Sequence, residues 1–373
     1  MTLVDRAREL RPLLLEREAD ADGLFEEAGF DRMLVPERYG GLELDMPTFL
    51  RVVVELARGA PAGAARLARA AGPALLVATL FAEEAQAEIF GSGAPRCAAV
   101  AAPAGAARRL EVGWELSGTF AGIPGAADAT HLLGQALAFE QGADEPPTPI
   151  VFVASRAQWA ARPGEGGLRL DGAVIPAHLV LEDLSLLDVD VPERTPGYRL
   201  HGSPRYAGRA MACLQAQLTA VVVGAAMAAV DEYERLVRSE QVPLPPLGPR
   251  RLDPDYQRWL GAAIGRVTAA ELLLDEVAGQ YAEACAGIET GEPFSREADL
   301  RLTMMGREAA RLARSAVDEI VRTAGARQQR EPIERIAHDL LTGWSHPAIP
   351  ADEDVARRLA GERLGLPATG WGR

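Results

Sequence analysis

Five histidines are the side chains of this sequence best suited to proton transfer near neutral pH, and one of them lies in a setting that favours chemistry. His346 stands in the run Trp344-Ser345-His346-Pro347, after a predicted short helix and before a proline. An imidazole in such a loop can act as a general acid or base. The alternative is a loop histidine that only hydrogen-bonds to backbone groups, and the residue types alone favour that alternative.

The other reactive residue types are too scattered to form a familiar site. His131, His178 and His201 lie in different segments and lack the spacing of metal ligands. Three widely separated cysteines include no CxxC pair, so neither a disulfide framework nor a zinc site is predicted. The sequence also lacks a GxSxG elbow, a P-loop and a GxGxxG turn after a strand. We therefore predict no metal site.

Length, composition and charge limit the class of protein. A chain of 373 residues is too long for one core and predicts two or three domains. The formal net charge of −14 disfavours binding to nucleic acid or to an anionic membrane surface. The start of the chain has no signal-peptide pattern, and the most apolar run, 218–230, is shorter than the roughly 20 residues that cross a bilayer. We expect a cytoplasmic protein with neither nucleic acid nor membrane as partner.

The order of predicted elements divides the chain into three parts. Residues 1–94 have helical periodicity, with helices expected over 46–58 and 64–90 and a Pro/Gly turn over 35–42. From Pro95 onward, short β-like runs separated by Gly/Pro turns predict a small barrel or sandwich. These strands are expected over 110–120, 131–139, 150–154, 168–174 and 178–187.

After Pro204 the pattern is again helical and predicts a four-helix bundle. Long helices are expected over 213–238, 255–286 and 296–324, and shorter ones over 335–344 and 353–364; the three long helices and a fourth form the bundle. The predicted domains are therefore an N-terminal helical domain (1–94), a middle β domain (95–200) and a C-terminal bundle domain (201–373).

Three motifs, in this order, resemble the acyl-CoA dehydrogenase superfamily over nearly the whole chain. They are GFDRMLVPERYGGL at 29–42, GWELSG at 113–118, and the AVDEI…G…PIER…HD pattern over 316–339. Within the superfamily, the chain is most similar to two-component monooxygenases that use reduced flavin to hydroxylate phenols. The implied fold is mainly α with a central β domain: N-terminal helices, a middle β-barrel and a C-terminal four-helix bundle.

The C-terminus distinguishes two branches of this superfamily. Many of the dehydrogenases carry a catalytic glutamate in an IYEGT motif after the aspartate that corresponds to Asp339. Here the seventh residue after Asp339 is His346 and the eighth is Pro347, which matches the histidine of the monooxygenases. The resemblance therefore implies that His346 is catalytic, as acceptor of a phenolic proton or as proton donor to the oxygen-carrying flavin.

The same resemblance implies cofactor contacts at five positions. Segment 122–128 occupies the place of a W-x-F-x-S-G motif, with Phe120 for the tryptophan and Pro124 for the serine. Glycine permits close backbone approach to the flavin, and arginine can pair with its phosphate. An ordinary strand-to-strand turn and solvent-exposed arginines are the alternatives. The implied cofactor-binding residues are Phe120, Gly122, Gly125, Arg169 and Arg327.

The leading hypothesis is hydroxylation of a small aromatic or polyketide-like substrate. The resemblance implies FADH2 or FMNH2 as cofactor, a separate flavin reductase as partner, and a homotetramer assembled through the bundle. One alternative is an acyl-CoA dehydrogenase-type enzyme that oxidises a Cα–Cβ bond with bound FAD. A second is a degenerate homologue with a non-redox or binding role, because the serine and tryptophan of the flavin motif are replaced.

Overall fold

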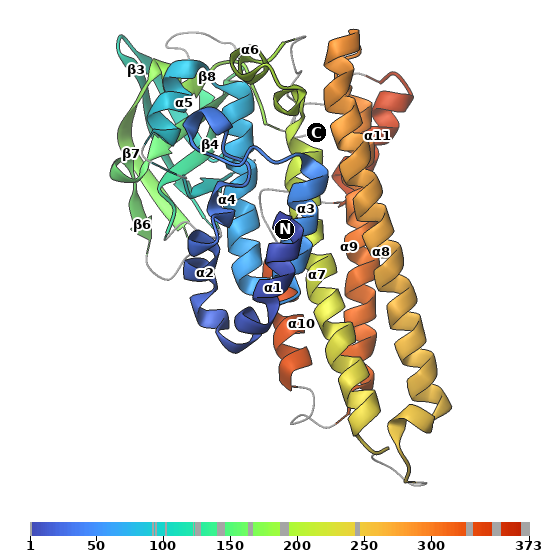
Figure 1. The fold of residues 1–373 in the computed structure, drawn as a ribbon. Helices are drawn as coiled ribbons and strands as arrows, with labels where there is room; N and C mark the ends of the chain where they lie inside the picture. Colours follow the sequence, from blue (N-terminus) through green and yellow to red (C-terminus); the bar gives the residue numbers. More distant parts are fainter. Residues whose placement is uncertain are drawn as a thin grey trace.

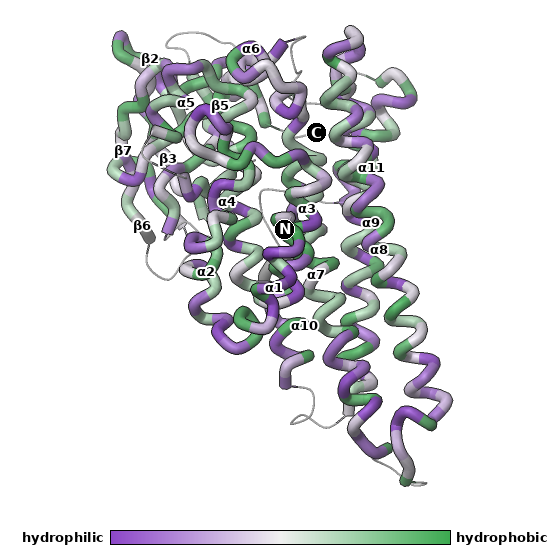
Figure 2. The backbone as a smooth tube through the Cα atoms, in the orientation of Figure 1, coloured by the Kyte–Doolittle hydropathy of each residue, from purple (hydrophilic) through white to green (hydrophobic). Residues whose placement is uncertain are grey.

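The fold places a β-sheet on one side, the N-terminal helices in the middle, and long antiparallel helices on the other side (Figure 1). The computed structural model describes residues 2–91, 93, 95–100, 103–121, 123, 128–139, 146–162, 167–186, 194–242, 247–325, 331–344 and 352–366. Apolar residues concentrate on the helices in the interior, while the outer elements carry more hydrophilic ones (Figure 2).

Five helices form the N-terminal layer. They are α1 (Leu3–Glu16), α2 (Ala21–Glu27), α3 (Met46–Ala57), α4 (Pro61–Leu80) and α5 (Glu83–Phe90). The single helix predicted over 64–90 is wrong, because the chain turns at Phe81, whose backbone is extended with φ −96° and ψ 151°. The fully buried Gln86 holds this turn, since its Nε2 donates to the carbonyl oxygens of Ala78 at 2.9 Å and Phe81 at 2.8 Å.

The Pro/Gly turn predicted over 35–42 is present, and its glycines are required sterically. Gly40 has a φ of +77°, which side chains rarely tolerate. At Gly41 a Cβ atom would lie 1.9 Å from the carbonyl oxygen of Val35. The turn therefore needs both glycines to bring the chain back toward α3.

The middle of the chain forms one curled sheet rather than two packed sheets. Its strand order is β6-β7-β3-β2-β4-β5-β8, and β1 pairs with β4 beside β2. The strands are β1 (Cys97–Ala99), β2 (Gly105–Leu110), β3 (Gly113–Phe120), β4 (His131–Ala138), β5 (Thr148–Ser155), β6 (Ala160–Arg162), β7 (Gly167–Pro176) and β8 (Val180–Leu181).

The predicted strands were incomplete in two ways. Sequence patterning missed β1, β2 and β6, which consist mainly of alanine and arginine and so lack a strong apolar alternation. The strand expected over 178–187 is reduced to Val180–Leu181, because a 3-10 turn (Ala177–Leu179) precedes it and a turn follows it.

The C-terminal part is built around α7. Its helices are α6 (Pro196–His201), α7 (Ala210–Ser239), α8 (Pro254–Ala286), α9 (Arg296–Thr323), α10 (Glu331–Trp344) and α11 (Asp352–Arg363). Helices α3 and α4 pack on α7 from one side, and α8, α9 and α10 also contact it. Among the described residues α7 is the one helix long and apolar enough to span a membrane, but 89% of its most apolar 18-residue window is buried inside the protein. The buried helix predicted around 218–230 is therefore confirmed, and it is longer than predicted.

A side chain from another helix caps the N-terminus of α7. Arg209 precedes the helix but forms no side-chain cap, and the Asp299 carboxylate of α9 accepts a hydrogen bond from the Ala212 N–H at 2.8 Å. Asp299 is 4% exposed, and this burial raises its pKa to about 6, although hydrogen bonds from Ala212 and Met211 and the charge of Arg209 oppose the increase. The Asp299 carboxylate therefore connects α9 to the N-terminus of α7.

We predict that this aspartate makes stability fall as pH rises from about 4 to about 6.5. The pKa of Asp299 in the folded state exceeds the ordinary aspartate pKa of 3.8, so the folded state binds the proton more tightly and loses that advantage once Asp299 ionises. Between pH 5 and 7.5 the unfolding free energy of the wild type, relative to Asp299→Asn, should drop by about 1 kcal/mol. Urea unfolding of both proteins at the two pH values checks this. A constant difference between them would contradict the role given to Asp299.

Candidate functional site

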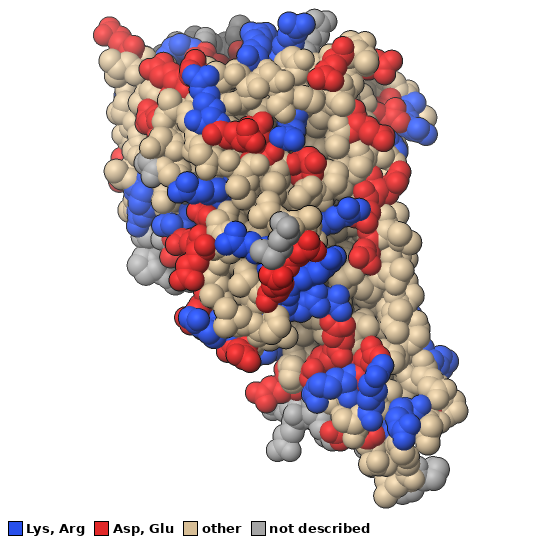
Figure 3. Space-filling model, in the orientation of Figure 1, with Lys and Arg blue, Asp and Glu red and all other residues tan. Residues whose placement is uncertain are grey.

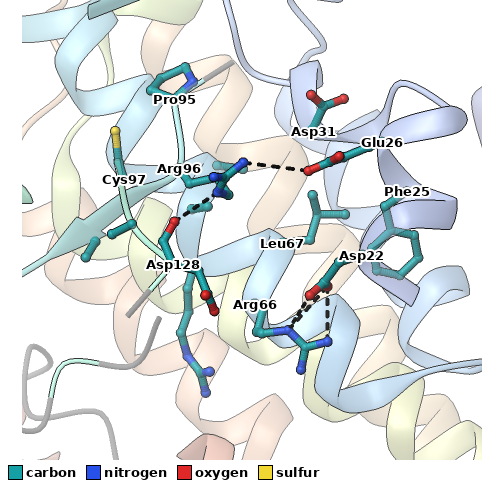
Figure 4. Close-up of a pocket in the computed structure, with 15 residues that line it drawn as sticks. Asp22, Phe25, Glu26, Asp31, Arg66, Leu67, Pro95, Arg96, Cys97 and Asp128 are labelled. Carbon is teal, nitrogen blue, oxygen red and sulfur yellow. Dashed lines mark hydrogen bonds and ion pairs between the residues drawn. The ribbon is translucent and has the colours of Figure 1, made fainter. Parts of the chain in front are cut away.

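A cavity of about 560 Å³ opens between the N-terminal helices and the edge of the sheet (Figure 4). Its walls come from α2, from the middle of α4, from the residues that lead into β1, and from Asp128 and Ala129 before β4. A volume of this size is typical of sites for small molecules and cofactors. The cavity therefore lies where the helical layer meets the sheet.

The cavity combines an apolar lining with charged groups. Its apolar lining residues are Phe25, Leu67, Ala70, Ala71, Pro95, Ala98 and Ala129. Cys97 also lines it, but burial raises the pKa of its thiol to about 12, so the thiol stays protonated and is a poor nucleophile. The lining suits an aromatic ring with polar substituents.

Two ion pairs connect α2 to the opposite walls, as the dashed lines in Figure 4 show. The Arg66 guanidinium donates from Nε to Asp22 Oδ2 at 2.9 Å and from Nη2 to Asp22 Oδ1 at 3.1 Å. Arg96 Nη1 lies 3.7 Å from Glu26 Oε1, and Arg96 Nε donates to the Asp128 carbonyl oxygen at 2.9 Å. Arg96 thus fixes the backbone at Asp128, the last residue of segment 122–128.

Two further ionisable groups of the cavity are shifted by burial. Burial raises the pKa of the Asp31 carboxyl, partly offset by the charge of Arg32. Burial lowers the pKa of the Arg69 guanidinium, and the positive charge of Arg66 lowers it further. Asp31 and Arg69 are therefore less solvated than the exposed Asp22, Glu26, Arg66 and Arg96.

Helix α10 reaches the same region from the C-terminal side. Arg69 lines the cavity and also a narrow space that it shares with Asp339 and Leu340 of α10. Arg335 Nε, on the same helix, lies 3.5 Å from Glu18 Oε2 near the N-terminal helices. The pKa of Asp339 is raised by burial, and the charge of His338 is the largest opposing effect. The helix that precedes His346 in the sequence therefore packs beside the cavity.

Most residues predicted for the site lie outside the described residues. These are His346, Gly122, Gly125 and Arg327. Their predicted roles stay predictions. Asp128, the last residue of segment 122–128, and Ala129 line the cavity.

The two described candidates are on adjacent strands, and neither is among the described residues that line the cavity. Phe120 of β3 is 1% exposed and packs edge-to-face on Phe152, with ring centroids 6.0 Å apart. Arg169 of β7 is exposed, and its Nη2 lies 3.4 Å from Asp171 Oδ2. Their flavin contacts also stay predictions.

Sequence analysis did not identify the charged residues that line the cavity. Asp22, Glu26 and Arg96 carry no motif, and only the fold brings them together. Arg66 and Arg69 did carry a signal, because they stand three residues apart in a helix otherwise rich in alanine. Two arginines on one face of such a helix indicate a polar surface inside an apolar layer.

Comparisons with known proteins agree with this arrangement. The family model described as "Acyl-CoA dehydrogenase, C-terminal domain" matches residues 216–350. The "XiaF from Streptomyces sp. in complex with FADH2 and Glycerol" structure superimposes with a TM-score of 0.82 at 20% identity, covering 98% of this chain and 96% of that one. The chain has the acyl-CoA dehydrogenase fold. The predicted fold class and the predicted resemblance are thereby confirmed.

Two sequence relatives match almost end to end. A "Pigment production hydroxylase" of Rhodococcus sp. (strain ATCC 21145) is 28% identical over 98% of this chain and 97% of the relative. The "Flavin-dependent monooxygenase, oxygenase subunit HsaA" of Rhodococcus jostii (strain RHA1) is 24% identical over 99% of this chain and 97% of the relative. These relatives favour the monooxygenase hypothesis over the dehydrogenase and the degenerate alternatives, and the flavin-dependent enzyme class and reduced cofactor predicted from the sequence agree with them.

Proposed function

We propose that this protein is a reduced-flavin-dependent monooxygenase that hydroxylates a small aromatic or polyketide-like substrate. The cavity between α2, α4 and the sheet supports this proposal most directly, because Asp128, the last residue of the segment for which the resemblance implies flavin contact, lines it together with Ala129. Asp339, which precedes His346 by seven residues in the sequence, lines the neighbouring narrow space that also contains Arg69. We expect the protein to act in the cytoplasm with a separate flavin reductase.

The residues of the cavity fit a flavin and an aromatic substrate. Its volume of about 560 Å³ and its apolar lining match planar rings, and its guanidinium groups match their oxygen substituents. We assign the backbone at Gly122 and Gly125 to the ring system, and Arg169 and Arg327 to the phosphate. Phe120, which precedes these glycines in the sequence, is buried in the sheet core against Phe152.

Each group of this chain then has a defined task. When bound, reduced flavin supplies the two electrons with which dioxygen gives one oxygen atom to the substrate and one to water. Phe25, Leu67 and the alanines of α4 exclude water from the reacting atoms. Arg96 donates to the Asp128 carbonyl oxygen and so restrains the backbone at Asp128. The His346 imidazole takes the phenolic proton as the ring is hydroxylated.

The first test is substitution of His346. In His346→Ala we expect hydroxylation to fall by roughly 10²–10⁴, the range for a positioned acid or base, with little change in folding or flavin affinity. Reduced flavin should instead be consumed to hydrogen peroxide, because the reaction with oxygen does not need the substrate proton. Product and peroxide per reduced flavin are the measured quantities.

His346→Asn separates hydrogen bonding from proton transfer, since an amide orients a substrate but does not titrate near neutrality. An alanine variant with wild-type product yield would contradict the assignment. An alanine variant that unfolds would make His346 a structural residue instead.

We also propose a homotetramer assembled through the bundle. The outer face of α8 carries an exposed stripe at helical spacing, formed by Gly261, Ile264, Gly265, Thr268 and Leu272. Ile264 is 43% exposed and Leu272 is 65% exposed, and a Cβ atom at Gly261 or Gly265 would meet nothing within 4 Å. Small residues beside exposed apolar ones allow a second helix to approach closely.

Leu272→Glu should therefore lower the assembly mass while leaving the fold intact, because the side chain is exposed within one chain. Val112→Glu is the matched control, since Val112 is 73% exposed in the turn between β2 and β3, remote from α8. Light scattering at micromolar concentration measures the mass. A stable wild-type monomer of 39.7 kDa would contradict the tetramer.

A further inference from the structure

A buried glutamine of α7 has an amide oxygen that none of the described residues satisfies. Gln217 is 2% exposed, and its Oε1 is buried without a hydrogen-bond donor in the part of the chain that the structure describes. An amide oxygen that loses its water on burial and gains no donor destabilises the folded state. Buried polar groups of this kind are uncommon in folded proteins, so Gln217 needs a role other than stability.

The neighbouring helix leaves room for this amide. A Cβ atom at Gly72 of α4 would lie 2.3 Å from both Nε2 and Oε1 of Gln217, so the amide occupies the space that a side chain at position 72 would fill. Gly72 directly follows Ala71, which lines the cavity. Leu218, the next residue of α7, lines the narrow space that Arg69 shares with α10. Gln217 and Gly72 are therefore direct neighbours of residues that line these two spaces.

Helix α10 runs along α4 toward Gly72. Near its start, Arg335 Nε lies 3.5 Å from Glu18 Oε2, in the turn before α2, and the first residue of α2 packs on the beginning of α4. About one turn later, Asp339 lines the same narrow space as Arg69, which lies further along α4. Gly72 is about one more turn along α4 in the same direction. The end of α10, which precedes the predicted catalytic segment, therefore points toward the unpaired amide.

We propose that Gln217 binds a hydroxyl group of the substrate, which donates a hydrogen bond to Oε1. This proposal rests on the proposed function for the reaction itself, but the binding can be measured without turnover. A hydroxyl has one hydrogen, so it cannot donate to Gln217 while it gives its proton to His346. The substrate therefore carries a second hydroxyl group, and the class that fits is a dihydroxylated aromatic compound.

The test compares two symmetric diols, 1,5- and 2,6-dihydroxynaphthalene, with 1-naphthol and 2-naphthol, which each lack one of the hydroxyl groups. Calorimetry on the full-length protein gives the affinities for the wild type, Gln217→Met and Gly72→Ala. Methionine keeps the length of the side chain but is only a weak acceptor, and a Cβ atom at position 72 displaces the amide without removing it. Gln257→Met is the matched control, because Gln257 is an exposed glutamine near the start of α8.

We expect at least one diol to bind the wild type about 10-fold more tightly than its naphthol, as for a buried acceptor that gains its donor. Gln217→Met and Gly72→Ala should remove this preference by weakening only the diol, and Gln257→Met should keep it. Equal affinities of the diols and the naphthols for the wild type would overturn the proposal. So would a preference that Gln217→Met leaves unchanged, or a variant that weakens diol and naphthol equally.

Thermal unfolding without ligand separates a binding role from a structural one. If the amide is unpaired until a ligand binds, Gln217→Met should keep or raise the melting temperature, because an apolar group replaces an unpaired polar one. Gln86→Met is the contrast, since Nε2 of Gln86 donates to two carbonyl oxygens and its Oε1 pairs with His201, so its loss should lower the melting temperature. A Gln217→Met protein that melts as far below the wild type as Gln86→Met would make Gln217 a structural residue and contradict the proposal.

Failure of the proposed function gives a different result from failure of this site. If hydroxylation is absent while the diol preference follows Gln217, the proposed function is wrong and the hydroxyl site stands. If hydroxylation proceeds while Gln217→Met binds all four compounds as the wild type does, the hydroxyl site is wrong and the proposed function stands.

Discussion

Most side chains of helix α7 are apolar and buried, so other helices must pack around it. The positions of these helices depend on that packing. The 30 residues of α7 are mostly buried alanine, valine and leucine. Exposing this apolar surface to water would raise the free energy of the folded state by far more than any single polar contact could lower it. Small residues let its neighbours approach closely: a Cβ atom at Gly224 would lie 2.3 Å from the Val54 carbonyl oxygen of α3. Helices α3 and α4 of the N-terminal layer pack on α7 and bury part of its apolar surface. Because α4 lies between α7 and the sheet, its other face becomes one wall of the cavity.

Electrostatic interactions hold the outer layer with weaker and more numerous contacts. Arg58 of α3 donates to Asp231 of α7 at 2.6 Å, and Arg307 of α9 lies 2.6 Å from Asp352, the first residue of α11. The partly exposed Arg58–Asp231 pair contributes up to about 1 kcal/mol, whereas the Arg307 guanidinium is buried and its pairing offsets a larger desolvation cost. The visible face in Figure 3 accordingly mixes acidic and basic side chains over α1 and the neighbouring helices. The core thus sets the position of α4 and, through the buried Ala21, Leu24 and Phe25, that of α2, while exposed ion pairs add to the contact of α2 with the opposite walls of the cavity.

The long helices could be predicted from sequence because each buries an apolar stripe whose period is strong. The 213–238 and 296–324 predictions differ from α7 and α9 by at most a few residues. The strands rich in alanine and arginine could not be found, because their pairing is decided by the neighbours in the sheet and not by their own pattern. The break at Phe81 depends on Gln86 hydrogen bonds that no local rule predicts. The cavity could not be predicted either, because α2, α4 and β1 are far apart in the sequence and come together only in the folded chain. His346, in contrast, was identified from a sequence motif.

The central claim is that the cavity serves reduced flavin and not a permanently bound oxidised cofactor. Anaerobic titration of the purified full-length protein with reduced and oxidised FMN, and with reduced and oxidised FAD, tests it most directly. Because the serine and tryptophan of the flavin-contact motif are replaced at Pro124 and Phe120, the account predicts weak binding of either oxidised flavin. Reduced flavin should bind at least about tenfold more tightly, a difference of about 1.4 kcal/mol. Oxidised FAD that binds as tightly as the reduced form, or that remains bound through purification, would contradict the account and favour the dehydrogenase alternative.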